Sequence, residues 1–361
     1  VNLLCKYFEY TKNDYFREKL KQTISFINIE FKNNENLYGS AYDADSEGVE
    51  GKYYIWSYQE LRNLIKDDFH IFEKKYLISK EGNFEGSNIL IEKKDYKLNL
   101  EEREKFQIIE NLLIKERLNR KKPLFDDKSQ TDLNAFWLYS LIQASITLKD
   151  IDLKNETLKS IDLLKKKLSK KIYHCYENDE VDVFLEDFVY YALLLISLYE
   201  IDGNNDHLAF TDNIMKKIWN IFFDKKTELL QKNQIENNDL FTSPVDVYDN
   251  NIPNGNSVYL YICNKLYNIT KDKIWLHKIE ILKKSFHALI NSNYSQMFSF
   301  IKVIDICEES ISFTFHGNLL NNSDILEFLQ RKYFGRATFI YNKVEDNDFV
   351  IICKNKTCSD K

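Results

Sequence analysis

The sequence has few of the residues that interrupt regular structure. Glycine occurs only 9 times and proline only 3 times in 361 residues, whereas 44% of the residues are hydrophobic and 14% are aromatic. A chain of this composition is not disordered, and it can bury a large core as one big domain or as two. Long apolar runs are also missing, since the longest, residues 188–199, is too short to cross a bilayer. We therefore expect a globular protein without a membrane partner.

Clustered positive charge is scarce as well. The net charge is -6 and the isoelectric point is about 5.7, whereas a nucleic-acid partner normally needs a basic face. The one dense basic run, within residues 165–171, follows a helical pattern with a single apolar stripe, so it is explained as the solvated side of a helix. We expect no nucleic-acid partner.

The six cysteines form no compact framework. They are scattered along the chain, which favours reduced thiols and a cytoplasmic location. Cys353 and Cys358 have a C-x4-C spacing, which is looser than the usual zinc pair, and no second pair or histidine cluster accompanies them. The sequence therefore predicts free thiols, no metal and no cofactor.

Two kinds of helix alternate along the chain. Residues 133–148 and 188–199 are apolar almost all round, so each must be covered on every side. By contrast, residues 16–27, 158–168 and 275–289 have one apolar stripe and charged residues on the opposite face of the helix. This alternation predicts a mainly α-helical (α/α)6-type toroid of helical hairpins, with parallel inner helices and outer helices antiparallel to them.

The two ends of the chain add to this prediction. Short strand patterns at residues 311–315, 337–341 and 349–353, with a helical pattern at 324–333, predict a small β-α-β-β appendage over residues 310–361. The toroid then spans residues 1–309. Because the helical pattern already runs at Val1, we expect an incomplete toroid that exposes apolar surface near residues 1–30.

An acidic loop lies at residues 38–56, which read YGSAYDADSEGVEGKYYIW. Two of the few glycines, Gly48 and Gly51, stand among its acids, so the loop needs unusual backbone. We expect an aromatic strand at residues 53–56 and acids that are held in place rather than solvated. The acidic side chains are Asp43, Asp45, Glu47 and Glu50.

Polar turns also lie just before the buried helical patterns. They are residues 123–128 before the helix at 133, residues 186–187 before that at 188, and residues 249–257 before that at 258. If the inner helices are parallel, these N-termini meet at one mouth, where free N–H groups favour anions and polar ligands. The alternative is that Asp, Asn and Ser simply cap the helices.

Several of these segments together resemble a known family. YGSAYDADSEGVEGKYYIW, GNFEGSNIL, RKKPLFDDK with Asn134, FLEDF, YDNNIPNGNSV and the terminal CKNKTC are similar, in order and spacing, to the thioredoxin-domain proteins that include spermatogenesis-associated protein 20. The resemblance implies an N-terminal thioredoxin-like domain, absent here, and a toroid similar to six-hairpin glycosidases and N-acylglucosamine 2-epimerases. It also implies a thioredoxin-like domain or subunit as a partner. None of the six histidines lies in a matched motif, so epimerase chemistry is not carried over.

Three functions remain open. A carbohydrate-active enzyme would place two carboxylates on either side of a glycosidic bond, and a non-catalytic binding module would use the same mouth for a sugar-like ligand. A calcium loop starting at Asp43 would need an acidic ligand where Tyr54 stands. For the enzyme, the candidate catalytic residues are Asp45, Glu47, Asp127 and Asp187. The candidate substrate-binding residues are Asp43, Glu50, Tyr54, Trp56, Lys128, Asn134, Asp249 and Asn256.

Overall fold

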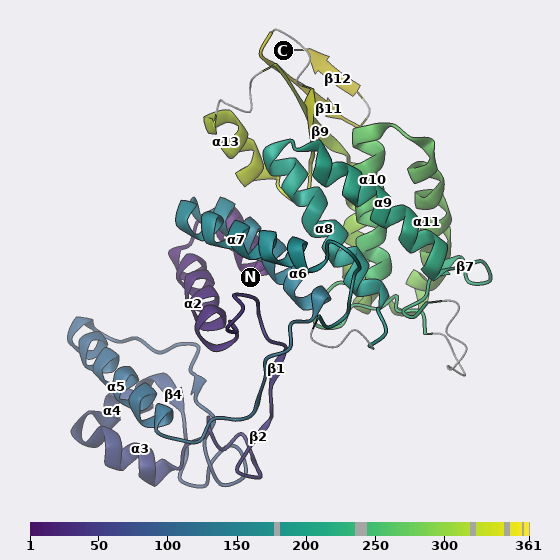
Figure 1. Ribbon diagram of the computed structural model, residues 1–361. Helices are drawn as coiled ribbons and strands as arrows, with labels where there is room; N and C mark the ends of the chain where they lie inside the picture. The colour runs from purple at the N-terminus through teal and green to yellow at the C-terminus, as the bar shows by residue number, and fades with distance from the viewer. Residues whose placement is uncertain (177–180, 235–243, 318–322, 343–346, 356, 361) are drawn as a thin grey trace. The chain divides into compact units, whose positions relative to one another are not determined.

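The structure is a computed structural model, shown in Figure 1. It describes residues 1–176, 181–234, 244–317, 323–342, 347–355 and 357–360. The chain divides into two compact units. Unit 1 contains residues 1–40 and 128–361, and unit 2 contains residues 41–127. The sequence did not indicate that residues 41–127 form a unit of their own.

Unit 1 is built mainly from helical hairpins. In its described part, α1 packs on α2, α6 on α7, α8 on α9 and α10 on α11, and α12 follows. The short 3-10 helix η2, Tyr294–Gln296, precedes α12. The helices are α1 Asn2–Thr11, α2 Asp14–Glu30, α6 Thr131–Leu148, α7 Ile151–Lys167, α8 Leu185–Asp202, α9 Asn205–Phe222, α10 Gly255–Thr270, α11 Lys273–Asn293 and α12 Phe298–Glu308. The predicted fold of helical hairpins is confirmed.

A repeated turn closes each hairpin. The first helix ends at a residue in the left-handed conformation, and the next residue is an Asn or Asp whose side chain accepts from the backbone of the second helix. Such a turn stops one helix and caps the next within a minimal connection, so the two helices run antiparallel. The pairs are Lys12–Asn13, Lys149–Asp150, Gly203–Asn204 and Lys271–Asp272.

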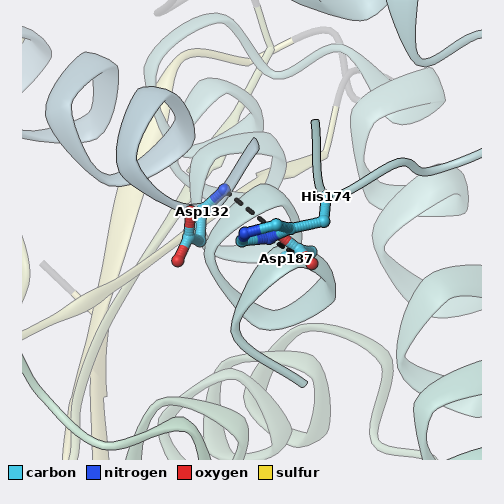
Figure 2. A group of neighbouring side chains, drawn as sticks. All are labelled: Asp132, His174 and Asp187. Atoms are coloured by element: carbon cyan, nitrogen blue, oxygen red, sulfur yellow. Dashed lines mark hydrogen bonds and ion pairs between the residues drawn. The ribbon is translucent and has the colours of Figure 1, made fainter. Parts of the chain in front are cut away.

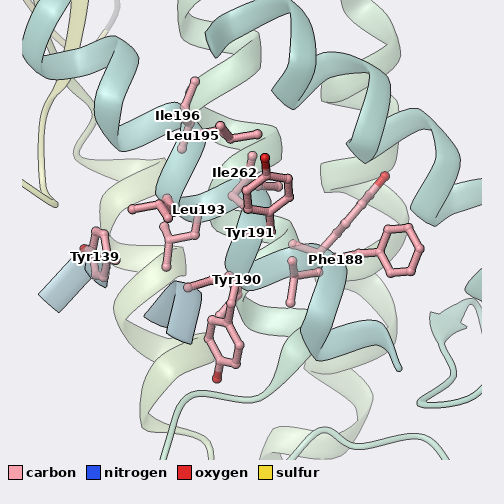
Figure 3. Packing of buried hydrophobic residues seen from close by; sticks show 14 of the residues in the cluster. Tyr139, Phe188, Tyr190, Tyr191, Leu193, Leu195, Ile196 and Ile262 are labelled. Atoms are coloured by element: carbon pink, nitrogen blue, oxygen red, sulfur yellow. The ribbon is translucent and has the colours of Figure 1, made fainter. Parts of the chain in front are cut away.

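Helices α6, α8 and α10 form the inner layer. Helix α8 is buried along nearly its whole length, and Figure 3 shows its side chains, among them Phe188, Tyr191 and Leu195, projecting to several sides into packed surroundings. It packs against α6, α9 and α10. Hydrogen bonds join the first turns of α6 and α8, and Tyr190 near the start of α8 to Pro253 just before α10. The neighbouring inner helices therefore have their N-terminal ends together, as parallel helices do and as the sequence predicts.

The C-terminal appendage has the predicted order of elements. Strand β9 (Ile311–His316), helix α13 (Ser323–Tyr333), strand β10 (Thr338–Asn342) and strand β11 (Phe349–Lys354) form β-α-β-β, and β12 (Thr357–Asp360) adds a further strand. The sheet order is β10-β9-β11-β12, with β9 and β10 parallel and the other pairs antiparallel.

One prediction about the cysteines is wrong. Cys353 and Cys358 are cross-strand partners in the β11–β12 hairpin and form a disulfide. The hairpin brings two thiols together that sequence spacing alone did not pair. Cys5, Cys175 and Cys263 are free and buried, and Cys307 is free and half-buried.

Unit 2 has a small core of its own. Trp56, Leu61, Phe72, Phe106 and Ile109 are buried together in it. The longer elements are α3 Tyr58–Ile65, η1 Lys66–Asp68, α4 Phe69–Lys75 and α5 Leu100–Leu118. Short strand pairs are β1 Ala41–Tyr42 with β6 Phe125–Asp126, β2 Asp45–Ser46 with β3 Val49–Glu50, and β4 Tyr76–Leu77 with β5 Ile91–Glu92. A similar pair in unit 1 joins β7 Phe223–Asp224 to β8 Leu229–Leu230.

The expected aromatic strand at residues 53–56 is wrong. Residues 53 and 54 lie in a turn, and only Trp56 forms an isolated bridge, with Asn88. Gly51 has a φ of 68°, which bends the chain before the aromatic residues. The backbone therefore turns where alternating side chains suggested an extended run.

Helices α1 and α2 expose the apolar surface that the sequence predicts near residues 1–30. The exposed side chains include Leu3, Tyr10, Tyr15, Phe26 and Ile29. Over the residues that the structure describes, we find no helix with the length and apolar character needed to span a membrane.

Candidate functional site

The N-terminal ends of α6, α8 and α10 meet within unit 1. The N–H of Asp132, in the first turn of α6, donates to Asp187 Oδ1 in the first turn of α8 at 3.3 Å. Tyr190 of α8 donates through its hydroxyl to the carbonyl of Pro253, which comes just before α10. A cluster of acidic side chains therefore gathers where three helix N-termini converge, and their dipoles favour negative charge there.

Asp187 is the centre of a hydrogen-bond network and is fully buried. Its Oδ2 accepts from the N–H of Phe184 at 2.9 Å. Nδ1 of His174 lies 3.0 and 3.1 Å from the two carboxylate oxygens (Figure 2). Asp187 thus caps α8 and orients the imidazole of His174, and their hydrogen bond raises the pKa of His174.

Asp132 lies beside this pair. Burial raises the pKa of Asp132 to about 6, and the negative charge of Asp187 adds to the effect. Asp132, His174 and Asp187 each offer a ligand atom within 4.8 Å of the others, so they are the group in the described residues that could hold a metal ion. However, both oxygens of Asp187 already accept N–H hydrogen bonds, so the network is satisfied without an ion.

Glu186 is the least satisfied acid of the cluster. Its Oε2 is buried and has no hydrogen-bond partner among the described residues. Burial raises the pKa of Glu186 to about 7, and the charges of Asp246 and Asp132 add to this. Gly255 fits closely against it, since a Cβ there would lie 3.0 Å from Glu186 Oε1 and 2.9 Å from Leu185 Cδ2. A carboxyl group that is half protonated near neutral pH suits proton transfer.

A cavity of about 820 Å³ lies within unit 1. Residues of α1, α2, α6, α8, α10 and α12 line it, so the inner helices form only part of its wall. Its wall is largely apolar and includes the aromatic residues Phe136, Trp137, Tyr139 and Tyr261. Leu133 and Pro253, beside the N-terminal ends of α6 and α10, also line it. The cavity therefore borders the acidic cluster.

Two predicted binding residues of unit 1 hold the backbone. Asn134 accepts from the N–H of Tyr38 and donates to its carbonyl, both at 2.9 Å. Asn256 pairs in the same way with Leu230, at 2.8 Å for both bonds, and also donates to Asp246. Both amides are buried, and their donors are used by protein partners. These contacts give the two side chains a structural role.

Asp249 and Lys128 differ in their surroundings. Asp249 accepts from the N–H and the side chain of Asn254 at 3.1 and 2.9 Å, and from the N–H of Ser299 at 2.6 Å. It therefore joins the turn before α10 to the first turn of α12. Lys128 is exposed on the segment that leads to α6.

The acidic loop of unit 2 is ordered but open. Glu47 and Gly48 form the tip of the β2–β3 hairpin with φ angles of 54° and 75°, as a tight hairpin turn requires. Asp43 Oδ1 accepts from the N–H of Asp45 at 3.1 Å, and Asp45 pairs across the hairpin with Glu50. All four acids of the loop are exposed, as is Asp127 after β6. The unusual backbone that the glycines predict is confirmed. The expectation that the acids are not solvated is wrong, because the short hairpin leaves all four side chains on its surface.

The charges and rings of this loop have protein partners. Glu47 forms an ion pair with Lys52 at 2.8 Å, and the hydrogen bond from Lys52 lowers the pKa of Glu47. Trp56 is only 3% exposed, and the Arg120 guanidinium lies 3.8 Å from its ring centroid. Tyr54 is 44% exposed. Of the predicted aromatic pair, Tyr54 alone presents its ring to solvent within unit 2.

The predicted convergence of Asp45, Asp127, Asp187 and Asn256 stays a prediction, because the first two belong to unit 2 and the last two to unit 1. Sequence reasoning missed Asp132, His174 and Glu186 as site residues. Glu186 had a signal, since it opens a buried helix beside Asp187. His174 had no such signal in the sequence, because only the folding of the loop between the two residues brings it beside Asp187.

No protein-family model and no curated protein matches the sequence. Similar solved structures include the GH76 α-mannanase BT2949 of Bacteroides thetaiotaomicron, at 16% identity over 90% of this chain and 84% of that chain, with a TM-score of 0.42. The GH76A α-1,6-mannanase of Salegentibacter sp. HEL1_6 is 12% identical over 74% and 68%, with a TM-score of 0.36. A family 105 glycoside hydrolase of C. acetobutylicum ATCC 824 is 14% identical over 80% and 74%, with a TM-score of 0.35.

Proposed function

We propose that this protein binds a sugar or sugar derivative in the cavity of unit 1 and processes it at the adjoining acidic cluster. The observation that carries this proposal is the cavity itself. Its volume of about 820 Å³ suits a small ligand, and its largely apolar wall combines several aromatic rings with a few polar side chains. Aromatic faces pack against the apolar faces of a sugar ring, while polar groups fix its hydroxyls.

The chemistry would rest on carboxyl groups of different acidity. Glu186, with a pKa of about 7, is suited to donate a proton to a leaving oxygen. Asp132, with a pKa of about 6, is largely ionised at neutral pH and is suited to accept one. Such a pair is what hydrolysis of a glycosidic bond requires. A second version of the proposal assigns the chemistry to the carboxylates that the sequence predicts, Asp45 or Glu47 acting together with Asp127.

A non-catalytic binding module is the alternative function. The observation that favours it is the engagement of Asp187, Asn134 and Asn256 in contacts with the backbone. If Glu186 and Asp132 serve only to close the helix ends, the cavity would hold its ligand unchanged. A thioredoxin-like partner belongs to this alternative, as a prediction from the sequence resemblance.

The test begins with a thermal-shift screen of sugars, sugar phosphates and uronic acids, followed by product analysis with each ligand found. We expect Glu186→Gln and Asp132→Asn each to abolish turnover while ligand binding is retained. Asp45→Asn and Asp127→Asn, both in unit 2, are the matched comparison, and loss of turnover in these variants alone would favour the second version. Binding by the wild type without any product would establish the binding module, and no binding at all would refute the proposal.

A further inference from the structure

The cavity has an unbalanced charge. Lysines 6 and 302 line it, and no aspartate or glutamate does so among the described residues. Lys6 is already paired, since its Nζ donates to Glu9 Oε2 at 2.8 Å and to the carbonyl of Phe334 at 3.3 Å. The positive charge of Lys6 is therefore balanced by the carboxylate of Glu9 on the same helix.

Lys302 on α12 is in a different position. Within the part of the chain that the structure describes, its ammonium has neither an ion pair nor a hydrogen bond, and its side chain is exposed. The charged groups that act on it are Lys6 and Lys265, and both are cations. Lys265 is in turn neutralised by Glu200 at 2.7 Å. An unpaired ammonium in a partly enclosed cavity is stabilised by a bound anion.

Two further residues of the cavity are polar and buried. Ser257 of α10 is 0% exposed, and its Oγ has no hydrogen-bond partner in the described residues. Gln143 of α6 is 4% exposed and likewise forms no side-chain hydrogen bond there. Buried polar groups are nearly always paired, so the hydroxyl of Ser257 is expected to meet a ligand, and the amide of Gln143 is free to bind the same ligand. Ser257 also stands in the first turn of α10, whose N-terminal dipole favours negative charge.

From these groups we infer that the cavity takes an anionic sugar derivative, whose phosphate or carboxylate pairs with Lys302 while Gln143 and Ser257 bind its polar oxygens. This inference rests on the proposed function, because it names the class of ligand for the same cavity. It does not depend on whether the ligand is processed.

Calorimetric titration with three matched probes tests the inference, namely a neutral hexose, its 6-phosphate and the corresponding uronic acid. We expect the wild type to bind at least one anionic probe at least about tenfold more tightly than the neutral hexose. The preferred anion identifies phosphate or carboxylate. Added salt should weaken anion binding and leave hexose binding nearly unchanged. Inorganic phosphate alone shows how much of the affinity comes from the anion.

The variants separate the charge from the shape of the cavity. Lys302→Met should remove most of the anion preference, Lys302→Arg should keep it, and Lys21→Met, at an exposed lysine of α2, should change nothing. Circular dichroism checks that each variant is folded. If Lys302→Met does not fold, the salt dependence of binding to the wild type still tests the inference. Equal affinity of the wild type for neutral and anionic probes would overturn the inference while the proposed function stands. Binding of no probe would overturn both.

Discussion

At the scale of single residues, two carboxyl groups at the helix N-termini, those of Glu186 and Asp132, are protonated more readily in the folded protein than in an unfolded chain. The pKa of Glu186 is raised to about 7 and that of Asp132 to about 6, both first by burial. His174 also has a raised pKa, through its hydrogen bond with Asp187. The folded state therefore binds more protons, so these groups stabilise it below their unfolded pKa values, and this contribution is lost as the pH rises through the folded values.

The first prediction concerns this pH dependence. Glu186→Gln removes one titrating group, so its free energy of unfolding should fall less steeply than that of the wild type between about pH 5 and 8. Over that pH range, the free energy of unfolding of the variant should fall by about 1–3 kcal/mol less than that of the wild type. Urea unfolding at several pH values measures it. Glu280→Gln on the exposed side of α11 is the matched control and should run parallel to the wild type; a parallel curve for Glu186→Gln would contradict the prediction.

The second prediction separates support of the backbone from ligand binding. Asn256→Ala leaves the buried N–H and C=O of Leu230 without partners, so we expect a loss of about 2–4 kcal/mol in the free energy of unfolding. Asn268→Ala, on the same helix but with a single 3.3 Å bond, should cost less than about 1 kcal/mol. Chemical denaturation measures both. A stable Asn256→Ala protein with weakened ligand binding would instead make Asn256 a ligand-binding residue.

At the scale of elements, a buried ion pair joins the inner helices to the appendage. Lys265 of α10 and Glu200 of α8 lie 2.7 Å apart and are almost completely buried. Lys265 also donates to the carbonyl of Ala337, and Glu200 accepts from the N–H of Phe339 at 3.1 Å. The pair thus connects two inner helices to the β10 region.

The third prediction uses this pair. Lys265→Met leaves Glu200 buried without a cation, which should cost about 3–5 kcal/mol. Adding Glu200→Gln should recover a large part of that loss, because the amide oxygen still accepts from Phe339 without a charge. A double-mutant cycle by urea unfolding measures the coupling. If the double variant is less stable than Lys265→Met, the uncompensated charge is not the cause of the loss.

The elements also show what sequence reasoning could reach. The patterns at residues 133–148 and 188–199 predict buried helices because apolar side chains on every side need cover on every side, and α6 and α8 confirm this. The hairpin turns were missed, although each repeats a left-handed residue before a capping Asn or Asp, because three of the four left-handed residues are lysines rather than glycines. Lysine gives no turn signal in a sequence.

At the scale of the whole molecule, the boundary of unit 2 was not predicted. The strands where it begins and ends, β1 and β6, are two residues long each, and no change in composition marks them. The candidate site was predicted only in part for a related reason. The convergence of helix N-termini follows from a parallel inner layer, whereas the positions of His174 and Lys302 depend on loops and packing that no local pattern encodes.

The last prediction is that the two units unfold separately. Phe72 is completely buried in unit 2, where its ring lies 4.9 Å from that of Tyr76 and 6.2 Å from that of Phe106. Phe72→Ala should therefore destabilise unit 2 by about 3–5 kcal/mol. In hydrogen exchange followed by mass spectrometry, peptides from residues 41–127 should lose protection, while peptides from α6, α8 and α10 keep theirs. Leu194→Ala, at a completely buried position of α8, is the reciprocal control and should affect unit 1 peptides instead. Loss of protection in both units from either substitution would mean that the chain unfolds as one cooperative whole, despite the separate core that Trp56, Phe72 and Phe106 form in unit 2.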